Sequence, residues 1–430
     1  MPNSSNAGPR AAAEPPSLLS NFSALAGSHV IGLVVPLLTV PYLARVLRPE
    51  GWAPVLVAQA LASWLVLLLD YGFDLSGTRA IALARARVER IDAVIWNIQY
   101  AKLLLVPVAA VILVIASFTL PALQNDSSLA LSTLLFIIAR GLNPLWYFQG
   151  LEQVRTAVSV DTGCKVLGAL SVFVWVTGVS DSWRVVALQA GFALISSVVL
   201  TLRLCRDVPP TRISARSALE VLQASWTLFA FRASSTLYMQ ANTLLLAVFS
   251  SALVVAGYGG AEKIVRAAIN LLEPLTRVLL PRISYLSASD PARAGQLIRQ
   301  TLLLLGTIGV AFGVAIVAAA PLLVSLLLGP GYENAIPVLR VLALLLPIIT
   351  VGTVLGTFWA LPFGQDRSLL LITASAGVLN VLLLLVLVPR LEAVGMAAAV
   401  VVAEAFVAMA LGVLYLRWRD ALRRAPAATT

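Results

Sequence analysis

Charged side chains occur inside stretches of this chain that are otherwise almost wholly apolar. An ionisable group in such surroundings can bind a ligand of opposite charge, exchange a proton or form an ion pair. A carboxylate four positions before a basic residue shares a helix face with it, so the two can neutralise each other. That spacing occurs in the pairs Asp161 and Lys165, Glu262 and Arg266, and Glu273 and Arg277.

Other basic residues in the apolar stretches have no acid three or four positions away: Lys102, Arg140, Arg232 and Lys263. We predict that they line, together with Arg266, a cationic cavity between helices. Its ligand should be an anion, and pyrophosphate suits arginine forks and lysine charges. The alternative is that the tertiary packing pairs each of these cations with Asp70, Asp74 or Glu404.

The segment DYGFDLSGTR, residues 70–79, concentrates polar groups directly after an apolar run. On a continuous helix Asp70 and Asp74 would share a face, and Gly72 would weaken the helix beside them. The pattern predicts an inner gate or a cation site. The alternative is a helix end with ordinary interfacial polarity. We group with these carboxylates, as candidates for gating or ion coupling, Arg79, His29, Asp161 and Glu273. His29 could titrate near neutral pH, although a lone histidine can equally be a packing residue.

The composition defines the elements that must position these groups. The chain is 60% hydrophobic and 12% charged, with a mean hydropathy of +0.93, whereas soluble domains carry roughly 25% charged residues. We therefore expect an all-α polytopic membrane protein. At about 20 apolar residues per crossing, the length gives about twelve transmembrane helices. Lys and Arg concentrate in the even-numbered connections and the C-terminal tail, which predicts that both termini are cytoplasmic.

A polar connection near the middle of the chain suggests two halves of six helices each. WYFQGLEQVR at 146–155 resembles WALPFGQDR at 359–367, which favours a parallel repeat, although chance similarity among apolar helices is the alternative. The predicted organisation is a disordered tail (1–17), a first lobe (18–205), a linker (206–218), a second lobe (219–417) and a basic tail (418–430).

Several function classes lack their signatures. There is no glycine-rich phosphate loop, and no external connection is long enough for a catalytic domain. The single histidine argues against a multi-histidine metal site, and the scattered positive charge is not a nucleic-acid footprint. We expect no cofactor, no nucleic-acid partner and no enzymatic activity, but movement of a substrate.

Several segments resemble the bacterial polysaccharide or O-antigen (Wzx-type) flippases of the MOP transporter superfamily. They are PLLTVPYLARVLRPEGWAPV with DYGFDLSGTRAIALAR, NPLWYFQGLE, and YGGAEKIVRAAINLLEPLTRVLLPRIS. The resemblance implies two six-helix lobes forming a V in the bacterial inner membrane. It also implies flipping of undecaprenyl-pyrophosphate-linked oligosaccharide from the inner to the outer leaflet by alternating access, coupled to H⁺ or Na⁺. A polysaccharide polymerase and a chain-length regulator are the partners that it suggests.

Two other functions stay open. A related branch exports drugs and commonly has an acidic cation site in its first helix, where this sequence has no acid. A membrane enzyme or scaffold of glycan assembly would need catalytic carboxylates on an external loop, and the available ones are scattered.

Overall fold

The structure is a computed structural model that describes residues 18–87, 92–124, 126–151, 153–211, 214–240, 242–271 and 273–424. Within those ranges the chain forms helices and turns and no β-strand, which confirms the all-α expectation. The elements of the first half are α1 (Leu18–Asp70), α2 (Phe73–Arg87), α3 (Asp92–Thr119), α4 (Ser127–Gly141), α5 (Leu145–Gly150), α6 (Val154–Trp175), η1 (Val179–Asp181) and α7 (Ser182–Asp207). Those of the second half are α8 (Ala215–Gln240), α9 (Asn242–Phe249), α10 (Ala252–Asn270), α11 (Glu273–Ser289), α12 (Pro291–Leu327), α13 (Ala335–Ala343), α14 (Leu345–Thr353), η2 (Val354–Ala360) and α15 (Asp366–Arg424).

Two helices are too long for a single crossing and fold back on themselves. The 53 residues of α1 contain Arg48 at φ 54°, and the 59 residues of α15 contain Glu392 at φ 48°. A helix of that length would span about 80–90 Å, against a hydrocarbon core of about 30 Å. The second hairpin needs Gly395, because a Cβ there would lie 2.4 Å from the Leu387 carbonyl oxygen.

Eight segments of the described chain are long and apolar enough to cross a membrane. The segments Val34–Ile81 and Asp366–Arg419 contain the two hairpins, so each accounts for two crossings. The pairs α8–α9 and α10–α11 supply two further helical segments, at the start of the second half. The order of elements therefore follows the expected twelve, and the chain is a multi-pass membrane protein.

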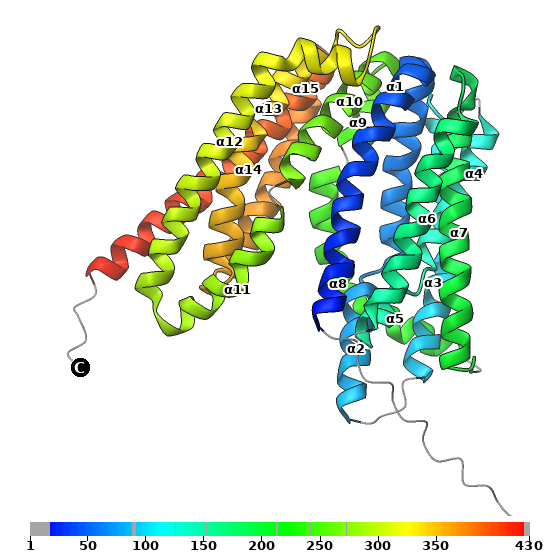
Figure 1. Cartoon of the computed structure of the whole chain (residues 1–430), viewed down its shortest axis with the longest axis horizontal. Helices are drawn as coiled ribbons and strands as arrows, with labels where there is room; N and C mark the ends of the chain where they lie inside the picture. Colours follow the sequence, from blue (N-terminus) through cyan, green and yellow to red (C-terminus); the bar gives the residue numbers. More distant parts are fainter. Residues whose placement is uncertain are drawn as a thin grey trace, which may run out of the picture.

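Figure 1 shows two groups of helices that meet at one end of the molecule and diverge toward the other. The described ends of α1 and α15 both lie on the diverging side, as an even number of crossings requires. The groups are joined mainly by α1 and α10, which pack so closely that a Cβ on Gly259 would lie 2.6 Å from Leu56 Cδ1. The first element of the predicted second lobe, α8, packs against α1, α2 and α3 as well as against α15.

Candidate functional site: a cationic cavity between the halves

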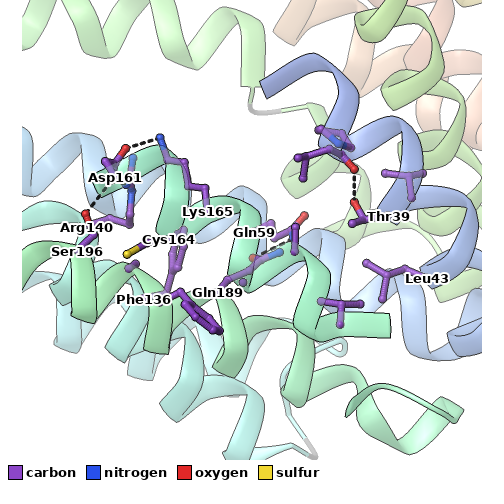
Figure 2. Close-up of a pocket in the computed structure, with 18 of the residues that line it drawn as sticks. Thr39, Leu43, Gln59, Phe136, Arg140, Asp161, Cys164, Lys165, Gln189 and Ser196 are labelled. Carbon is purple, nitrogen blue, oxygen red and sulfur yellow. Dashed lines mark hydrogen bonds and ion pairs between the residues drawn. The ribbon is translucent and has the colours of Figure 1, made fainter. Parts of the chain in front are cut away.

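A cavity of about 320 Å³ lies among helices of the first half, on the side that one residue of the second half reaches. Its walls come from α1, α4, α6 and α7 of the first half, and Lys263 on α10 of the second half completes them. Most of the lining is apolar, and the polar groups gather at two places. One is a cluster around Asp161, and the other is the pair Gln59 and Gln189 (Figure 2). Lys263 lies beside this pair.

Two cations share one carboxylate in the first cluster. Arg140 Nη1 lies 2.7 Å from Asp161 Oδ1, and Lys165 Nζ lies 2.7 Å from Asp161 Oδ2. Ser196 Oγ also donates to Asp161 Oδ1, at 3.2 Å. The Asp161 side chain is only 4% exposed, whereas Lys165 is 53% exposed. The cluster therefore carries a net positive charge, and Lys165 is the cation with the readiest access to a ligand.

Lys263 reaches the cavity from the opposite half. Its ammonium donates to Gln59 Oε1 at 3.4 Å and lies 5.8 Å from the centre of the Trp52 ring. The amide of Gln59 in turn donates to Gln189 Oε1 at 3.2 Å. Within the part of the chain that the structure describes, Lys263 makes no ion pair with a carboxylate.

Two further cavities continue the site into the second half. One of about 410 Å³ shares Gln59, Phe136, Gln189 and Lys263 with the first and extends to Glu262 and Arg266. The next, of about 120 Å³, shares Glu262 and Arg266 and extends to α15. Arg266 Nη2 lies 2.7 Å from Glu262 Oε1 and Thr243 donates to Glu262 Oε2, so Arg266 and Glu262 balance each other, as their spacing predicts. The excess positive charge therefore belongs to the Arg140, Lys165 and Lys263 part of the site.

The structure divides the predicted cavity cations into two groups. Arg140, Lys263 and Arg266 line these cavities, but Lys102 and Arg232 do not. Lys102 is fully buried, with Nζ 2.7 Å from Asp70 Oδ1 and 3.0 Å from the Gly141 carbonyl oxygen. Arg232 forms an ion pair with Asp74. Lys102 and Arg232 therefore follow the alternative, in which tertiary packing pairs them with Asp70 and Asp74, because spacing along one helix does not reveal a carboxylate that a different helix supplies.

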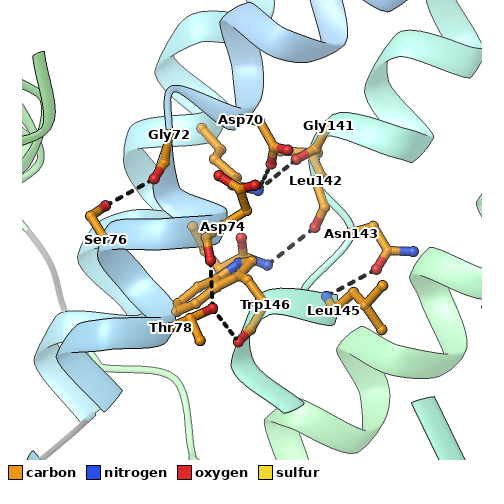
Figure 3. A network of polar contacts seen from close by, with 12 residues as sticks. Asp70, Gly72, Asp74, Ser76, Thr78, Gly141, Leu142, Asn143, Leu145 and Trp146 are labelled. Carbon is orange, nitrogen blue, oxygen red and sulfur yellow. Dashed lines mark hydrogen bonds and ion pairs between the residues drawn. The ribbon is translucent and has the colours of Figure 1, made fainter. Parts of the chain in front are cut away.

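The 70–79 segment is a joint rather than a continuous helix (Figure 3). Tyr71 at φ 45° and Gly72 at φ 77° separate α1 from α2. Asp70 and Asp74 therefore do not share a face, contrary to the expectation for an unbroken helix, and they bind Lys102 and Arg232 respectively.

The same joint attaches α8 to the first half. Tyr71 stacks on Phe229 of α8 at 4.4 Å, and Ser76 Oγ lies 3.2 Å from Ser225 Oγ. The side chain of Arg79 is exposed and lines none of the cavities described above. The side chains of His29 and Glu273 lie outside the described residues, so their predicted roles stay predictions.

Sequence reasoning missed Lys165 and the glutamines. The spacing predicts that Asp161 neutralises Lys165, and that ion pair does form. Arg140 binds the same carboxylate, however, so one positive charge remains. Gln59 and Gln189 carry no charge and stand 130 positions apart, so no pattern along the chain links them.

Comparisons with known proteins concern the family and the fold of the chain. The model of a family described as "Polysaccharide biosynthesis protein" matches residues 18–287. A protein of Escherichia coli (strain K12) named "Putative O-antigen transporter" is 25% identical over 397 residues, covering 91% of this chain and 95% of that protein. A protein of Shigella dysenteriae with the same name is 26% identical, covering 89% and 96%.

Solved structures share the fold at low identity. One titled "Lipid II flippase MurJ, inward closed conformation" has a TM-score of 0.69 at 12% identity, covering 93% of this chain and 87% of that chain. Another, titled as the outward-facing conformation of a multidrug resistance MATE family transporter of the MOP superfamily, has a TM-score of 0.57 at 16% identity, covering 94% and 97%. At such identities the likeness concerns the fold alone.

Proposed function

This chain belongs to the polysaccharide biosynthesis protein family, and from that premise we propose that it flips a lipid-linked oligosaccharide across the bacterial inner membrane. The names of the two O-antigen transporter relatives support this proposal. The likeness of its fold to MOP transporters supports movement of a substrate rather than catalysis on it. The finer proposal is that the cargo is joined to its prenyl carrier through a pyrophosphate, which enters the cavity while the prenyl chain stays in lipid.

The excess positive charge of the cavity carries the finer proposal. Arg140 and Lys165 share Asp161, whereas among the described residues Lys263 contacts the neutral amide of Gln59 and the Trp52 ring but pairs with no carboxylate. An ammonium in a membrane interior is costly unless an anion or a hydrogen-bond acceptor stabilises it. A pyrophosphate offers several charged oxygens, so it can bind Lys263 and compete with Asp161 for Lys165.

That competition suggests how transport could be coupled to an ion. If pyrophosphate oxygens take over Lys165 and Arg140, the buried Asp161 carboxylate loses its partners. An uncompensated carboxylate in such surroundings favours its protonated form. We propose that this dependence of the Asp161 carboxylate on its two cations is the point at which transport is coupled to a cation gradient, with H⁺ or Na⁺ as the coupling ion.

Nothing in the site favours the two competing functions. A cationic drug would meet Lys165 and Lys263, which repel it. A glycan-assembly enzyme would need carboxylates placed for acid–base work, whereas Asp161 and Glu262 each bind a cation.

The test is a charge series at Lys263. We expect Lys263→Gln to lower delivery of lipid-linked oligosaccharide to the outer leaflet by about tenfold to a hundredfold, the equivalent of one charge-assisted hydrogen bond. Lys263→Arg should retain much of the activity, because the charge stays. Arg340→Gln is the matched control, since Arg340 is exposed on α13 and lines none of the three cavities.

Delivery would be measured in inverted membrane vesicles with a fluorescent lipid-linked oligosaccharide, at equal membrane levels of each variant. Parental delivery by Lys263→Gln would contradict the role given to the cavity charge. Delivery by none of the proteins, the parent included, would contradict the flippase proposal itself.

A further inference from the structure

A second large hollow lies on the second half, away from the cationic cavity. It measures about 960 Å³ and lies between the first turns of α12, the last turns of α15 and the α14–η2 region, so we call it the α12–α15 groove. It shares no lining residue with the three cavities described above. Figure 1 shows α12 and the end of α15 at the edge of the helix group that is remote from α1.

The groove sits at the level where the membrane meets water. In α12 the polar start of the helix ends at Arg299 and Gln300, and an almost wholly apolar run begins at Thr301. In α15 the apolar run ends at Leu416, directly before Arg417. By the distribution of Lys and Arg along the chain, this end of both helices is cytoplasmic. The groove therefore spans the boundary between the inner-leaflet headgroups and the acyl chains.

The polar end of the groove is cationic. Arg299 and Arg419 line it together with Gln296 and Asp290. The Asp290 carboxylate caps α12 by accepting a hydrogen bond from the backbone N–H of Arg293 at 3.0 Å. Its negative charge is therefore directed at the N-terminus of α12. Arg299 is exposed and has no ion-pair partner among the residues that the structure describes. An anion at this end would gain Arg299, which pairs with no carboxylate of the described residues.

The other end of the groove is apolar and kept open by small residues. Leu302, Leu303, Val351 and Leu355 form its walls. Ala408 and Gly412 stand one turn apart on the same face of α15. A Cβ added at Gly412 would meet only Leu355 Cδ1, at 3.9 Å, so the glycine leaves real space.

An aromatic wall fixes the shape of the groove between its two ends. Trp418 packs against Phe363 at 4.7 Å and Trp359 at 5.7 Å, and Tyr415 packs on Trp359 at 5.3 Å. Amphipathic rings of this kind are favoured at the headgroup level of membranes. The packing of these rings against one another therefore holds the groove in shape without a bound ligand.

We propose that the α12–α15 groove binds an anionic glycerophospholipid of the inner leaflet. Its phosphate lies at Arg299 and Arg419, and an acyl chain follows Leu302, Leu355 and Gly412 into the membrane. Basic pockets between helices on the cytoplasmic side are sites of this kind. The bound lipid would occupy the gap that α12 and α15 leave between them.

The test uses the purified full-length protein and two lipid probes with identical chains, dioleoyl phosphatidylglycerol and dioleoyl phosphatidylcholine. Native mass spectrometry would count the lipids retained by each variant. We expect the parent to retain phosphatidylglycerol preferentially, and Arg299→Gln to weaken that retention about fivefold. Gly412→Leu should abolish retention of both lipids by filling the groove. Arg293→Gln is the control, because Arg293 is an exposed arginine of α12 that does not line the groove.

Equal retention of the two lipids by the parent would overturn the proposal, since the headgroup charge would then be irrelevant. Unchanged phosphatidylglycerol retention in both Arg299→Gln and Gly412→Leu would place the lipid elsewhere. Displacement of phosphatidylglycerol by undecaprenyl phosphate would also overturn it, because the groove would then hold the carrier of the transported substrate. If Gly412→Leu does not fold, the surface variant Arg299→Gln still tests the site, and unchanged phosphatidylglycerol retention in that variant would overturn the proposal.

Discussion

Lys102 illustrates how a charge can be wholly structural in a membrane protein. Its side chain is fully buried, while its partner Asp70 is 32% exposed. The ammonium also donates to the carbonyl oxygen of Gly141 on α4. One lysine therefore ties α3 to the end of α1 and to the end of α4, at the joint where α1 becomes α2.

The unequal burial of this pair predicts unequal costs when one partner is removed. Asp70→Asn leaves a buried ammonium without its counter-charge and should destabilise the protein by about 3 kcal/mol, the lower end of the range for a broken buried pair. Lys102→Met leaves a carboxylate that reaches solvent and should cost less. The double variant should recover part of the loss. Thermal unfolding in detergent would measure this, and equal losses in the two single variants would contradict the assignment.

At the scale of elements, glycines decide which helices can lie in contact. A Cβ on Gly309 of α12 would lie 3.0 Å from the backbone oxygen of Leu346 and 3.0 Å from Pro347 Cα. Both atoms belong to the backbone of α14, so they cannot move aside as a side-chain tip can. The spacing of α12 and α14 therefore depends on the absence of a side chain at this position.

Gly309→Ala should accordingly destabilise the second half by about 1–3 kcal/mol, the usual cost of overpacking. The matched control is Gly306→Ala, one turn earlier on the same helix, where a Cβ would meet nothing within 4 Å. That substitution should be neutral or stabilising, because alanine favours a helix over glycine by up to about 1 kcal/mol. The melting temperature should fall for Gly309→Ala and should stay the same or rise for Gly306→Ala, and equal shifts would show that helix propensity alone is being measured.

For the molecule as a whole, the two groups of helices are closed at the end away from the chain termini. The guanidinium of Arg45 on α1 donates to the Leu326 carbonyl oxygen at the end of α12. The buried hydroxyl of Tyr332 donates to the Ala44 carbonyl oxygen at 3.1 Å. Burial, with a smaller contribution from the Glu50 carboxylate, raises the pKa of Tyr332 above its ordinary value, so the hydroxyl stays protonated and can donate.

The flipping that we propose, if it proceeds by alternating access, requires these outer contacts to open. A reversible cross-link between Arg45→Cys and Leu326→Cys, made with a short bifunctional thiol reagent after Cys164→Ser and Cys205→Ser, should reduce transport to background. Reduction of the cross-link should restore transport. Each single cysteine variant treated with the same reagent is the control. Full transport in the cross-linked protein would show that the outer ends do not separate during the cycle.

The sequence by itself determined the class of molecule. Hydropathy and helix length require a polytopic all-α membrane protein, because backbone groups in lipid must be satisfied within each helix. The sequence also predicted two ion pairs, Asp161 with Lys165 and Glu262 with Arg266. Residues four apart on a helix are neighbours in any tertiary arrangement.

Only the tertiary structure decided which charges line the cavity. Lys102 and Arg140 look alike in sequence, each a lone cation in an apolar helix, yet Lys102 is buried against Asp70 and Arg140 faces the cavity. The difference depends on which helices pack together and how they rotate, and neither quantity is encoded in spacing along one helix. The same holds for Gln59 and Lys263, which stand 204 residues apart and meet because α1 and α10 join the two halves.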